Sequence, residues 1–289
     1  MKNLDEIKNR IINVINTDDT FKNHVYVVGG YVRDFIMNIE PKDIDLVIDI
    51  NKGNIKFANA IKKCYSNITT NPIRLGAYPI RQIQFIDLNE TIEIADTMKE
   101  TFPDKFSRQR KTAFASLEED INRRDFTINS LLLDLTNNKI IDFVDGIDDI
   151  KKRIIRCNSN VNPEEIFSAD PLRILRGIRF AVKYNFQIEE NTFNAMKKVG
   201  NRINIISNER IYSELKNICK IKKGLKNAVI LMDKLDILKY IFPEVNHLKT
   251  IYQAPDSRLV HLEGSEYTCK NFIKRSINYG KDENHNTEL

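Results

Sequence analysis

The sequence predicts an α+β protein in which a half containing both strands and helices is followed by an all-helical half. Several short apolar runs are typical of strands, and they occupy residues 25–28, 43–50, 83–86, 91–95 and 140–144. From about residue 147 onward such runs disappear, and apolar residues recur at helical spacing instead. A polar stretch at 99–111 has no periodicity, which predicts a loop.

The helices are predicted from apolar spacing. Leu4, Ile7, Ile11 and Ile15 recur among charged residues and indicate an amphipathic helix at the start of the chain. Further helices are predicted at 31–38, 126–133, 147–153, 163–168, 170–184, 190–199, 208–220 and 225–240. The change of pattern predicts three domains, namely a strand-containing domain at 1–146, a helical domain at 147–220 and a helical part with a tail at 221–289.

Composition indicates a cytoplasmic globular protein. Of the 289 residues, 42% are hydrophobic and 29% are charged, and no apolar run reaches the roughly 18 residues that a membrane-spanning helix needs. The N-terminal residues show no signal-peptide pattern. The four cysteines include no CxxC pair, which argues against a zinc site or a disulfide framework. The formal net charge of +5 suits a polyanionic partner without requiring one.

Two aspartates, Asp43 and Asp45, flank Ile44 in the strand predicted at 43–50. Successive side chains of a strand point to opposite faces, so we expect both carboxylates on one face and Ile44 in the core. The two like charges repel unless a cation lies between them, and a pair of Mg²⁺ ions about 3.5–4 Å apart would remove that conflict. Alone, such a pair is more often two solvated aspartates at a strand edge, so further motifs must decide.

A glycine doublet, Gly29-Gly30, separates the strand at 25–28 from the helix that follows. Glycine at such a junction lets the backbone approach a ligand closely, and amides at a helix N-terminus can hold phosphate. Most glycine doublets are simply turns. Arg33 and Asp34 come next, either as a paired structural element beside the site or in direct contact with a ligand.

A second motif, RRDFTIN at 123–129, precedes the apolar helix predicted there. Its two arginines offer forked donors for triphosphate oxygens. Asp125 can cap the helix or accept a hydrogen bond from a ribose hydroxyl, and Asn129 would lie one turn further on the same face. Alone, this motif more often marks a capped core helix with surface arginines.

A third motif, ADPLRILR at 169–176, predicts a helix start with Asp170 as N-cap, because proline follows it. Asp170, Arg173 and Arg176 share one side of this helix with Gly177, opposite an apolar stripe. The carboxylate and guanidinium groups could hydrogen-bond the edge of a nucleotide base and so act as a protein template. An ordinary capped helix with exposed arginines is the alternative.

Together these motifs resemble one known family. The string GGYVRDFIMNIEPKDIDLVI at 29–48 resembles the GGxVRD…DxD signature of the class II tRNA nucleotidyltransferase and poly(A) polymerase family, within the polymerase-β-like nucleotidyltransferase superfamily. RRDFTIN matches a second family motif without departure, whereas the third resembles EDxxRxxR with Ala169 in place of the usual Glu. The stretches DFVDGIDD at 142–149 and SNER at 207–210 resemble two further family motifs, so the resemblance spans roughly residues 25–220.

The resemblance implies roles for particular residues. Asp43 and Asp45 would be catalytic and hold Mg²⁺, while Glu93 is either a further metal-site residue or an edge-strand glutamate. The implied nucleotide-binding residues are Gly29, Gly30, Arg33, Arg124, Asp125, Asn129, Asp170, Arg173 and Arg176. Gly146 would make a bend, and the pair Glu209-Arg210 would brace the nucleotide-binding arginines.

The resemblance also implies a fold and a reaction. The fold would be a polymerase-β-like head with a mixed sheet, then an all-helical neck and a partial body. In the reaction, an RNA 3′-hydroxyl attacks the α-phosphate of ATP or CTP, and addition of CCA to tRNA 3′ ends is the first choice. Poly(A) or A-only addition is the alternative, and a non-catalytic RNA-binding protein is the alternative of another class. Family members usually continue through further helical domains, so the sequence is expected to be a compact variant, the product of a truncated gene, or one half of a two-chain enzyme in which a second chain supplies the missing C-terminal domains.

Overall fold

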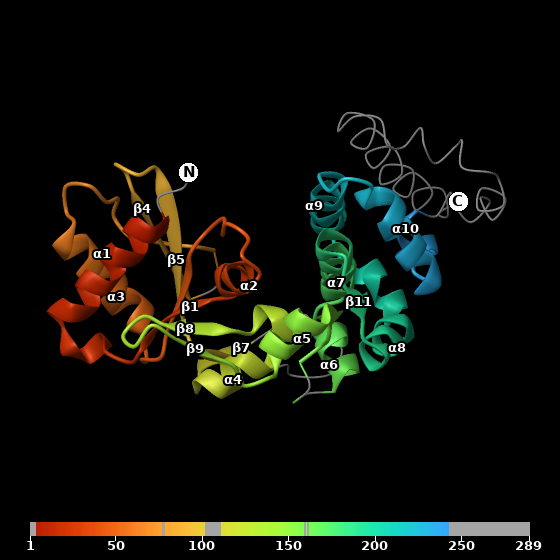
Figure 1. Ribbon diagram of the computed structural model, residues 1–289, viewed down its shortest axis with the longest axis horizontal. Helices are drawn as coiled ribbons and strands as arrows, with labels where there is room; N and C mark the ends of the chain where they lie inside the picture. Colours follow the sequence, from red (N-terminus) through yellow and green to blue (C-terminus); the bar gives the residue numbers. More distant parts are fainter. Residues whose placement is uncertain (1–3, 77–78, 102–110, 159, 161, 243–289) are drawn as a thin grey trace, which may run out of the picture. The chain divides into compact units, whose positions relative to one another are not determined.

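The computed structural model describes residues 4–76, 79–101, 111–158, 160 and 162–242 (Figure 1). The chain divides into two compact units, of which unit 1 runs through Lys152 and also includes 158–161. Unit 2 comprises 153–157 and the residues from 162 onward. Among the described residues, no helix is long and apolar enough to cross a membrane. The three sequence-based domain limits stay predictions.

Unit 1 is built on a seven-stranded mixed sheet, which confirms the predicted fold class. The strand order is β3-β4-β5-β2-β1-β8-β9, and β2 and β5 run parallel while the other neighbouring pairs are antiparallel. The strands are β1 (Val25–Val28), β2 (Asp45–Ile48), β3 (Ile73–Arg74), β4 (Ile80–Phe85), β5 (Glu90–Asp96), β8 (Leu132–Asp134) and β9 (Lys139–Ile141). The central strands β1 and β2 are buried on both faces, except at Asp45, which begins β2 and is half-buried. Their apolar residues allow helices to pack over them.

The helices α1 (Leu4–Thr17) and α3 (Gly53–Cys64) lie on one side of this sheet, and α2 (Gly30–Ile36) lies on the other (Figure 1). The predicted apolar stripe of α1 is buried. Helix α3 begins where the carboxylate of Asp96, at the end of β5, accepts a hydrogen bond of 2.6 Å from the backbone N–H of Asn54. This contact satisfies one of the first amides of the helix.

Two sequence-based expectations in unit 1 are wrong. The stretch 99–111 was expected to be a loop, but its ends belong to an antiparallel hairpin of β6 (Met98–Thr101) and β7 (Lys111–Phe114), and 102–110 lie outside the described residues. The helix expected at 126–133 is a short 3-10 turn, η2 (Thr127–Asn129), followed by β8. Periodicity cannot distinguish a buried strand from a buried helix in so short an apolar run.

The turn at 142–149 leads into α5 (Gly146–Lys152) and is held by a carboxylate. Asp142 accepts hydrogen bonds from the backbone N–H groups of Val144, Gly146 and Ile147 at 2.9–3.0 Å. Gly146 does not make the bend, because the positive φ of 59° belongs to Asp145. Glycine is needed at 146 for a close approach, since a Cβ atom there would overlap the backbone carbonyl of Thr127.

We expect Gly146→Ala to lower the free energy of unfolding by about 1–3 kcal/mol, because the added methyl group forces α5 away from η2. Urea denaturation of both proteins measures the change. Gly76→Ala provides a control for glycine replacement, because no atom of the described residues lies within 4 Å of its Cβ position, although its φ of 60° adds local strain. An unfolding curve of Gly146→Ala that overlays the wild-type curve would contradict the close approach.

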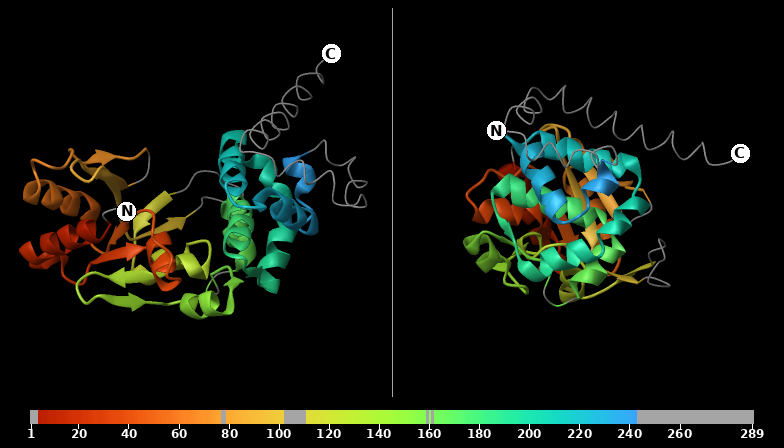
Figure 2. Two further views of the ribbon diagram at one scale, coloured as in Figure 1. Left: turned by 45° about the horizontal axis from the view of Figure 1, so that its top comes forward. Right: turned by 90° about the vertical axis from the view of Figure 1, so that its right-hand side faces the viewer.

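Unit 2 is helical, as predicted, and its helices are coloured green to blue in Figure 2. A short parallel pair formed by β10 (Ile154–Ile155) and β11 (Gln187–Ile188) is the exception among its described residues. Helix α7 packs against α9 and α10, and Ile174, Leu175 and Ile178 on its apolar stripe are fully buried. The described helices of this unit are α6 (Pro163–Ala169), α7 (Leu172–Tyr184), α8 (Glu190–Lys198), η3 (Gly200–Ile205), α9 (Asn208–Cys219), α10 (Gly224–Lys234) and α11 (Leu238–Ile241).

Candidate active site

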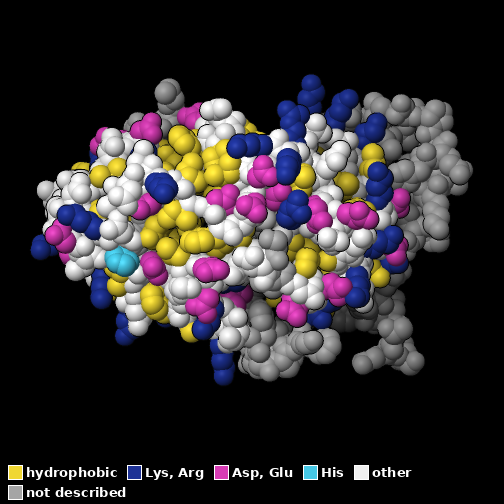
Figure 3. All heavy atoms as spheres, turned by 60° about the horizontal axis from the view of Figure 1, so that its bottom comes forward, with side chains coloured by type: hydrophobic (Ala, Val, Ile, Leu, Met, Phe, Trp, Pro, Cys, Tyr) yellow, Lys and Arg dark blue, Asp and Glu magenta, His cyan; other side chains and the backbone are white. Residues whose placement is uncertain are grey.

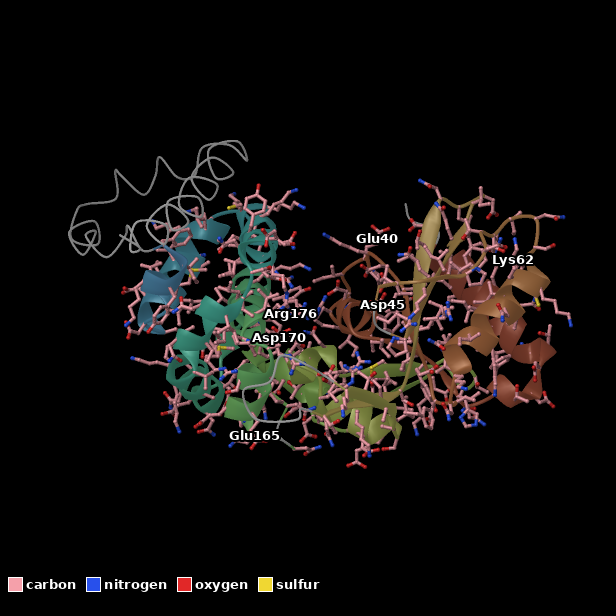
Figure 4. All side chains as sticks on the ribbon, turned by 180° about the vertical axis from the view of Figure 1, so that it is seen from behind. Glu40, Asp45, Lys62, Glu165, Asp170 and Arg176 are labelled. Carbon is pink, nitrogen blue, oxygen red and sulfur yellow. The ribbon has the colours of Figure 1, made fainter. Side chains whose placement is uncertain are left out.

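The candidate active site of unit 1 contains three carboxylates at the middle of the sheet. Asp45 is the first residue of β2, and parallel pairing with β5 places it directly beside Glu93. Asp43 lies just before the strand and is exposed, whereas Asp45 and Glu93 are half-buried. Figure 4 labels Asp45 on this strand. The structure thus brings Glu93, which the sequence left open, next to the predicted aspartate pair.

The electrostatics of Asp45 reflect this crowding. Burial, followed by the negative charges of Asp43 and Glu93, raises the pKa of Asp45 to about 6, while the positive charge of Arg124 lowers it. A carboxylate that is partly removed from water beside two like charges holds its own charge at a cost. The site is therefore suited to a bound cation.

A divalent metal ion fits the donor set of this site. Carboxylate oxygens are the ligands that Mg²⁺ prefers, and protein sites for Mg²⁺ often supply one or two carboxylates while substrate phosphates and water supply the rest. Within the described part of the chain, no three His, Cys, Asp or Glu side chains form a preassembled metal cluster. The arrangement therefore matches two carboxylate ligands, Asp43 and Asp45, with further ligands from a bound triphosphate.

The glycine doublet lies beside these carboxylates. Gly29 has a φ of 68° and precedes α2, and this conformation favours glycine over other residues. A Cβ atom on Gly30 would lie 3.5 Å from Nη2 of Arg33 and 4.0 Å from Oδ1 of Asp43. Glycine at 30 therefore leaves open space between the start of α2 and Asp43.

A buried polar chain connects α2 to the RRDFTIN motif. The guanidinium of Arg33 donates to Oδ1 of Asp34 at 2.8 Å and to Oδ1 of Asn129 at 2.5 Å. Asn129 in turn donates to Oδ1 of Asp125 at 3.2 Å, and all four residues are at most 7% exposed. Asp125 was expected to cap a long helix, but it accepts from the N–H of Phe126 ahead of η2. These hydrogen bonds hold the start of α2 and the RRDFTIN motif in a fixed position relative to each other.

One residue of unit 1 was missed from the sequence. Asp120, in α4 (Leu117–Asn122), accepts hydrogen bonds from both arginines of RRDFTIN, with Nη2 distances of 2.7 Å for Arg123 and 2.8 Å for Arg124. The available signal was its spacing of three and four residues from these arginines, which are neighbouring positions along a helix.

Unit 2 carries the third motif at the start of α7. The carboxylate of Asp170 accepts from the N–H of Leu172 at 3.3 Å, in keeping with the predicted capping role, and from Nη2 of Arg210 at 2.8 Å. Arg173 and Arg176 are half-buried on the polar side of α7, and Figure 4 labels Asp170 and Arg176. Arg210, expected to brace the arginines together with Glu209, thus contacts the carboxylate of the motif.

Two family models match the chain. Residues 25–156 match the family model of the poly A polymerase head domain, and residues 185–249 match the model described as a probable RNA and SrmB-binding site of polymerase A. The CCA-adding enzyme of Ligilactobacillus salivarius is 36% identical over 190 residues, covering 65% of this chain and 44% of the relative. That of Staphylococcus epidermidis is 32% identical over 217 residues, covering 75% of this chain and 50% of the relative.

Solved structures give the same result. The Thermotoga maritima CCA-adding enzyme complexed with tRNA has a TM-score of 0.68 at 28% identity, with 82% of this chain and 53% of that chain covered. The chain belongs to the tRNA nucleotidyltransferase and poly(A) polymerase family. Its nucleotidyltransferase head corresponds to unit 1, and it spans about half the length of the curated relatives it matches.

Nucleotidyltransferases of this family generally use divalent metal ions, in agreement with the donor set around Asp45. On the face shown in Figure 3, acidic and basic side chains are interspersed, so this face carries no uniformly positive field.

Proposed function

We propose that this nucleotidyltransferase adds CMP and AMP from CTP and ATP to RNA 3′ ends without a template, and that its principal substrate is a tRNA that lacks the CCA end. Curated relatives named CCA-adding enzymes, and solved structures of CCA-adding enzymes with tRNA, ATP and CTP, support the choice of these substrates. A cytoplasmic location remains a prediction.

The observation that carries the proposal is the placement of Asp45 directly beside Glu93 by the pairing of β2 with β5, two residues after Asp43. We assign the cofactor as Mg²⁺, held by Asp43 and Asp45, with Glu93 beside them. Bound there, the ion would stabilise the attacking and leaving oxygens of an in-line displacement. Without it, the carboxylates repel each other and the triphosphate.

The other residues of unit 1 bind and orient the nucleotide. Arg124 presents a guanidinium to the triphosphate, and its charge already acts on Asp45. Asp125 accepts a hydrogen bond from the ribose, while Asn129, itself held by Arg33, keeps the carboxylate of Asp125 in place. The backbone at Gly29 and Gly30 admits the phosphates closely.

Base choice belongs to unit 2 in this proposal. Asp170 and Arg173 offer an acceptor and donors to the edge of cytosine or adenine, and Arg176 completes the polar side of α7. Arg210 keeps the carboxylate of Asp170 in one orientation. Ala169, which stands in place of the usual glutamate of the family motif, affects the selectivity of this site more than the chemistry in unit 1.

The test of this function supplies the purified chain with tRNA lacking CCA, tRNA ending in CC and a generic oligonucleotide. Each RNA is offered the four triphosphates singly and mixed, and the products are sequenced. Protein with Asp45→Ala, prepared in parallel, controls for a contaminating host enzyme. We expect addition of CCA to tRNA, with termination after the A.

The other outcomes each have a definite meaning. Long A tracts on any RNA would replace the proposal with poly(A) polymerase activity, which the name of the matching head-domain model favours as the alternative. A alone added to tRNA ending in CC would indicate a second chain that adds CC. RNA binding without incorporation would make the chain a non-catalytic RNA-binding protein.

A further inference from the structure

The carboxylate of Asp120 is the centre of a buried polar cluster next to the catalytic strand. Its side chain is 1% exposed, and its two oxygens accept hydrogen bonds from three residues. Oδ1 accepts from the backbone N–H of Met98 at 3.1 Å and from Nε and Nη2 of Arg123 at 3.0 and 2.7 Å. Oδ2 accepts from Nε and Nη2 of Arg124 at 3.2 and 2.8 Å.

Two guanidinium groups stabilise the charge of this buried group. Burial by itself raises the pKa of Asp120, but the charges and hydrogen bonds of Arg124 and Arg123 overcome that effect and hold the pKa below its ordinary value. Asp120 is therefore ionised at neutral pH. A buried carboxylate with two-point contacts restricts side chains that would otherwise sample many rotamers.

The contact with Asp120 orients Arg124 for a second partner. Nε and Nη2 face Asp120, and no acceptor among the described residues bonds to Nη1 of Arg124. The guanidinium has five N–H donors in a rigid plane, so donors remain for phosphate oxygens. Ile121, the neighbour of Asp120 in α4, packs in one core cluster with Val47 of β2, so this helix lies against the strand that carries Asp45.

Arg123 connects the same cluster to the β6–β7 hairpin. It donates from Nε to the carbonyl oxygen of Met98 at 2.9 Å and from Nη1 to Oε1 of Glu100 at 3.1 Å. Asp120 also accepts from the N–H of Met98, so this carboxylate contacts both strand β6 and Arg124. A shift of the hairpin would therefore shift the guanidinium of Arg124.

We propose that Asp120 is a positioning residue for the incoming nucleotide: it fixes the guanidinium of Arg124 for the triphosphate and links it to the β6–β7 hairpin. This inference rests on the proposed function, because it requires that Arg124 binds the triphosphate. Asp120 itself does not contact substrate and acts only through its neighbours.

The first measurement compares Asp120→Asn with the wild-type protein. Asparagine keeps the shape and one acceptor oxygen but turns an amide group toward a guanidinium, so the orientation of Arg124 is lost. Since hydrogen bonds to charged groups are strong, we expect the Kd for ATP to rise about 10-fold or more. Adenosine has no phosphate for Arg124 to bind, so its inhibition constant should change less than about 2-fold.

Asp87→Asn is the matched control. Asp87 also accepts two hydrogen bonds from one arginine, Arg10, at 2.7 and 2.9 Å within unit 1, so the variant removes a two-point ion pair that lies outside the motifs. Its Kd for ATP should equal that of the wild type. If Asp120→Asn does not fold, Asp120→Glu is decisive, because it keeps the charge but moves the carboxylate by one methylene group and should weaken ATP binding likewise.

A double-mutant cycle distinguishes positioning from a general structural role. Arg124→Met should weaken ATP binding alone, and Asp120→Asn in that background should weaken it no further, because there is no guanidinium left to orient. A variant that merely loosens the fold would lower affinity equally in both backgrounds, and that result would overturn the proposal.

Failure of this inference differs from failure of the proposed function. If the wild-type protein binds and incorporates nucleotides but Asp120→Asn binds ATP normally, the inference is wrong and the function stands. If the wild-type protein neither binds ATP nor extends RNA, the function is wrong, and the inference is wrong with it. Normal ATP binding by Arg124→Met would overturn the role assigned to Arg124 and, with it, the inference about Asp120. The proposed function, tested by nucleotide incorporation into RNA, would still stand.

Discussion

Asp45→Asn is expected to lower nucleotide incorporation by at least about 10²-fold, equivalent to about 2.7 kcal/mol of activation free energy. The loss follows from the position of Asp45 between Asp43 and Glu93, where it is the most buried ligand proposed for the ion. Incorporation of labelled ATP and CTP into tRNA at saturating Mg²⁺ measures the effect, and Asp43→Ala should behave similarly.

The same substitution should stabilise the metal-free protein. The pKa of Asp45 is about 6 in the folded state, above its ordinary value of 3.8, so folding is favoured by the protonated form. This contribution is fully present below pH 3.8 and is lost as the pH rises through about 6. Asparagine does not titrate, so above pH 6 the variant should be more stable, by at most about 2–3 kcal/mol.

Urea unfolding in EDTA at several pH values tests whether Asp45→Asn raises the free energy of unfolding. The stability difference between Asp45→Asn and the wild type should grow from about pH 4 to pH 6 and then level off. Asp49→Asn, just beyond the other end of β2, is a control, because the carboxylate of Asp49 accepts a hydrogen bond of 3.2 Å from the hydroxyl of Thr97 and is not among the proposed metal ligands. Near-normal incorporation by Asp45→Asn would contradict its catalytic assignment.

Exchange of the charges in unit 2, Asp170→Arg with Arg173→Asp, is expected to change which nucleotide is added more than how much is added. A buried polar group left unpaired costs about 1–3 kcal/mol, so the wild-type site should disfavour UTP and GTP roughly 5- to 150-fold relative to CTP and ATP. The exchanged pair should lose this preference, because donor and acceptor positions are inverted.

Single-nucleotide incorporation with each of the four triphosphates measures the preference. The exchange Glu164→Lys with Lys198→Glu is the control, since this pair joins α6 and α8 at 2.7 Å in the same unit but is largely exposed. It should leave nucleotide choice unchanged. Equal use of all four nucleotides by the wild-type chain would contradict a templating role for Asp170 and Arg173, though not the metal chemistry in unit 1.

Elements whose contacts are local were predictable from the sequence. The apolar stripe of α7 is buried where the helical period placed it, and Asp170 accepts from the start of that helix as its position before proline indicated. The strand-containing half and the change to helices after residue 147 were likewise visible as a change of period. Short apolar runs were the exception, since 126–133 forms η2 and a buried strand.

The sequence by itself determined the chemistry available to this protein: two aspartates one residue apart, a double arginine, and a carboxylate and arginine on one side of a helix. The tertiary structure alone decided which distant groups join them. Parallel pairing of β2 with β5 puts Glu93 beside Asp45, and packing in unit 2 brings Arg210 to Asp170. Strand register and helix packing depend on burying the whole apolar surface together, so no local pattern of residues encodes these contacts.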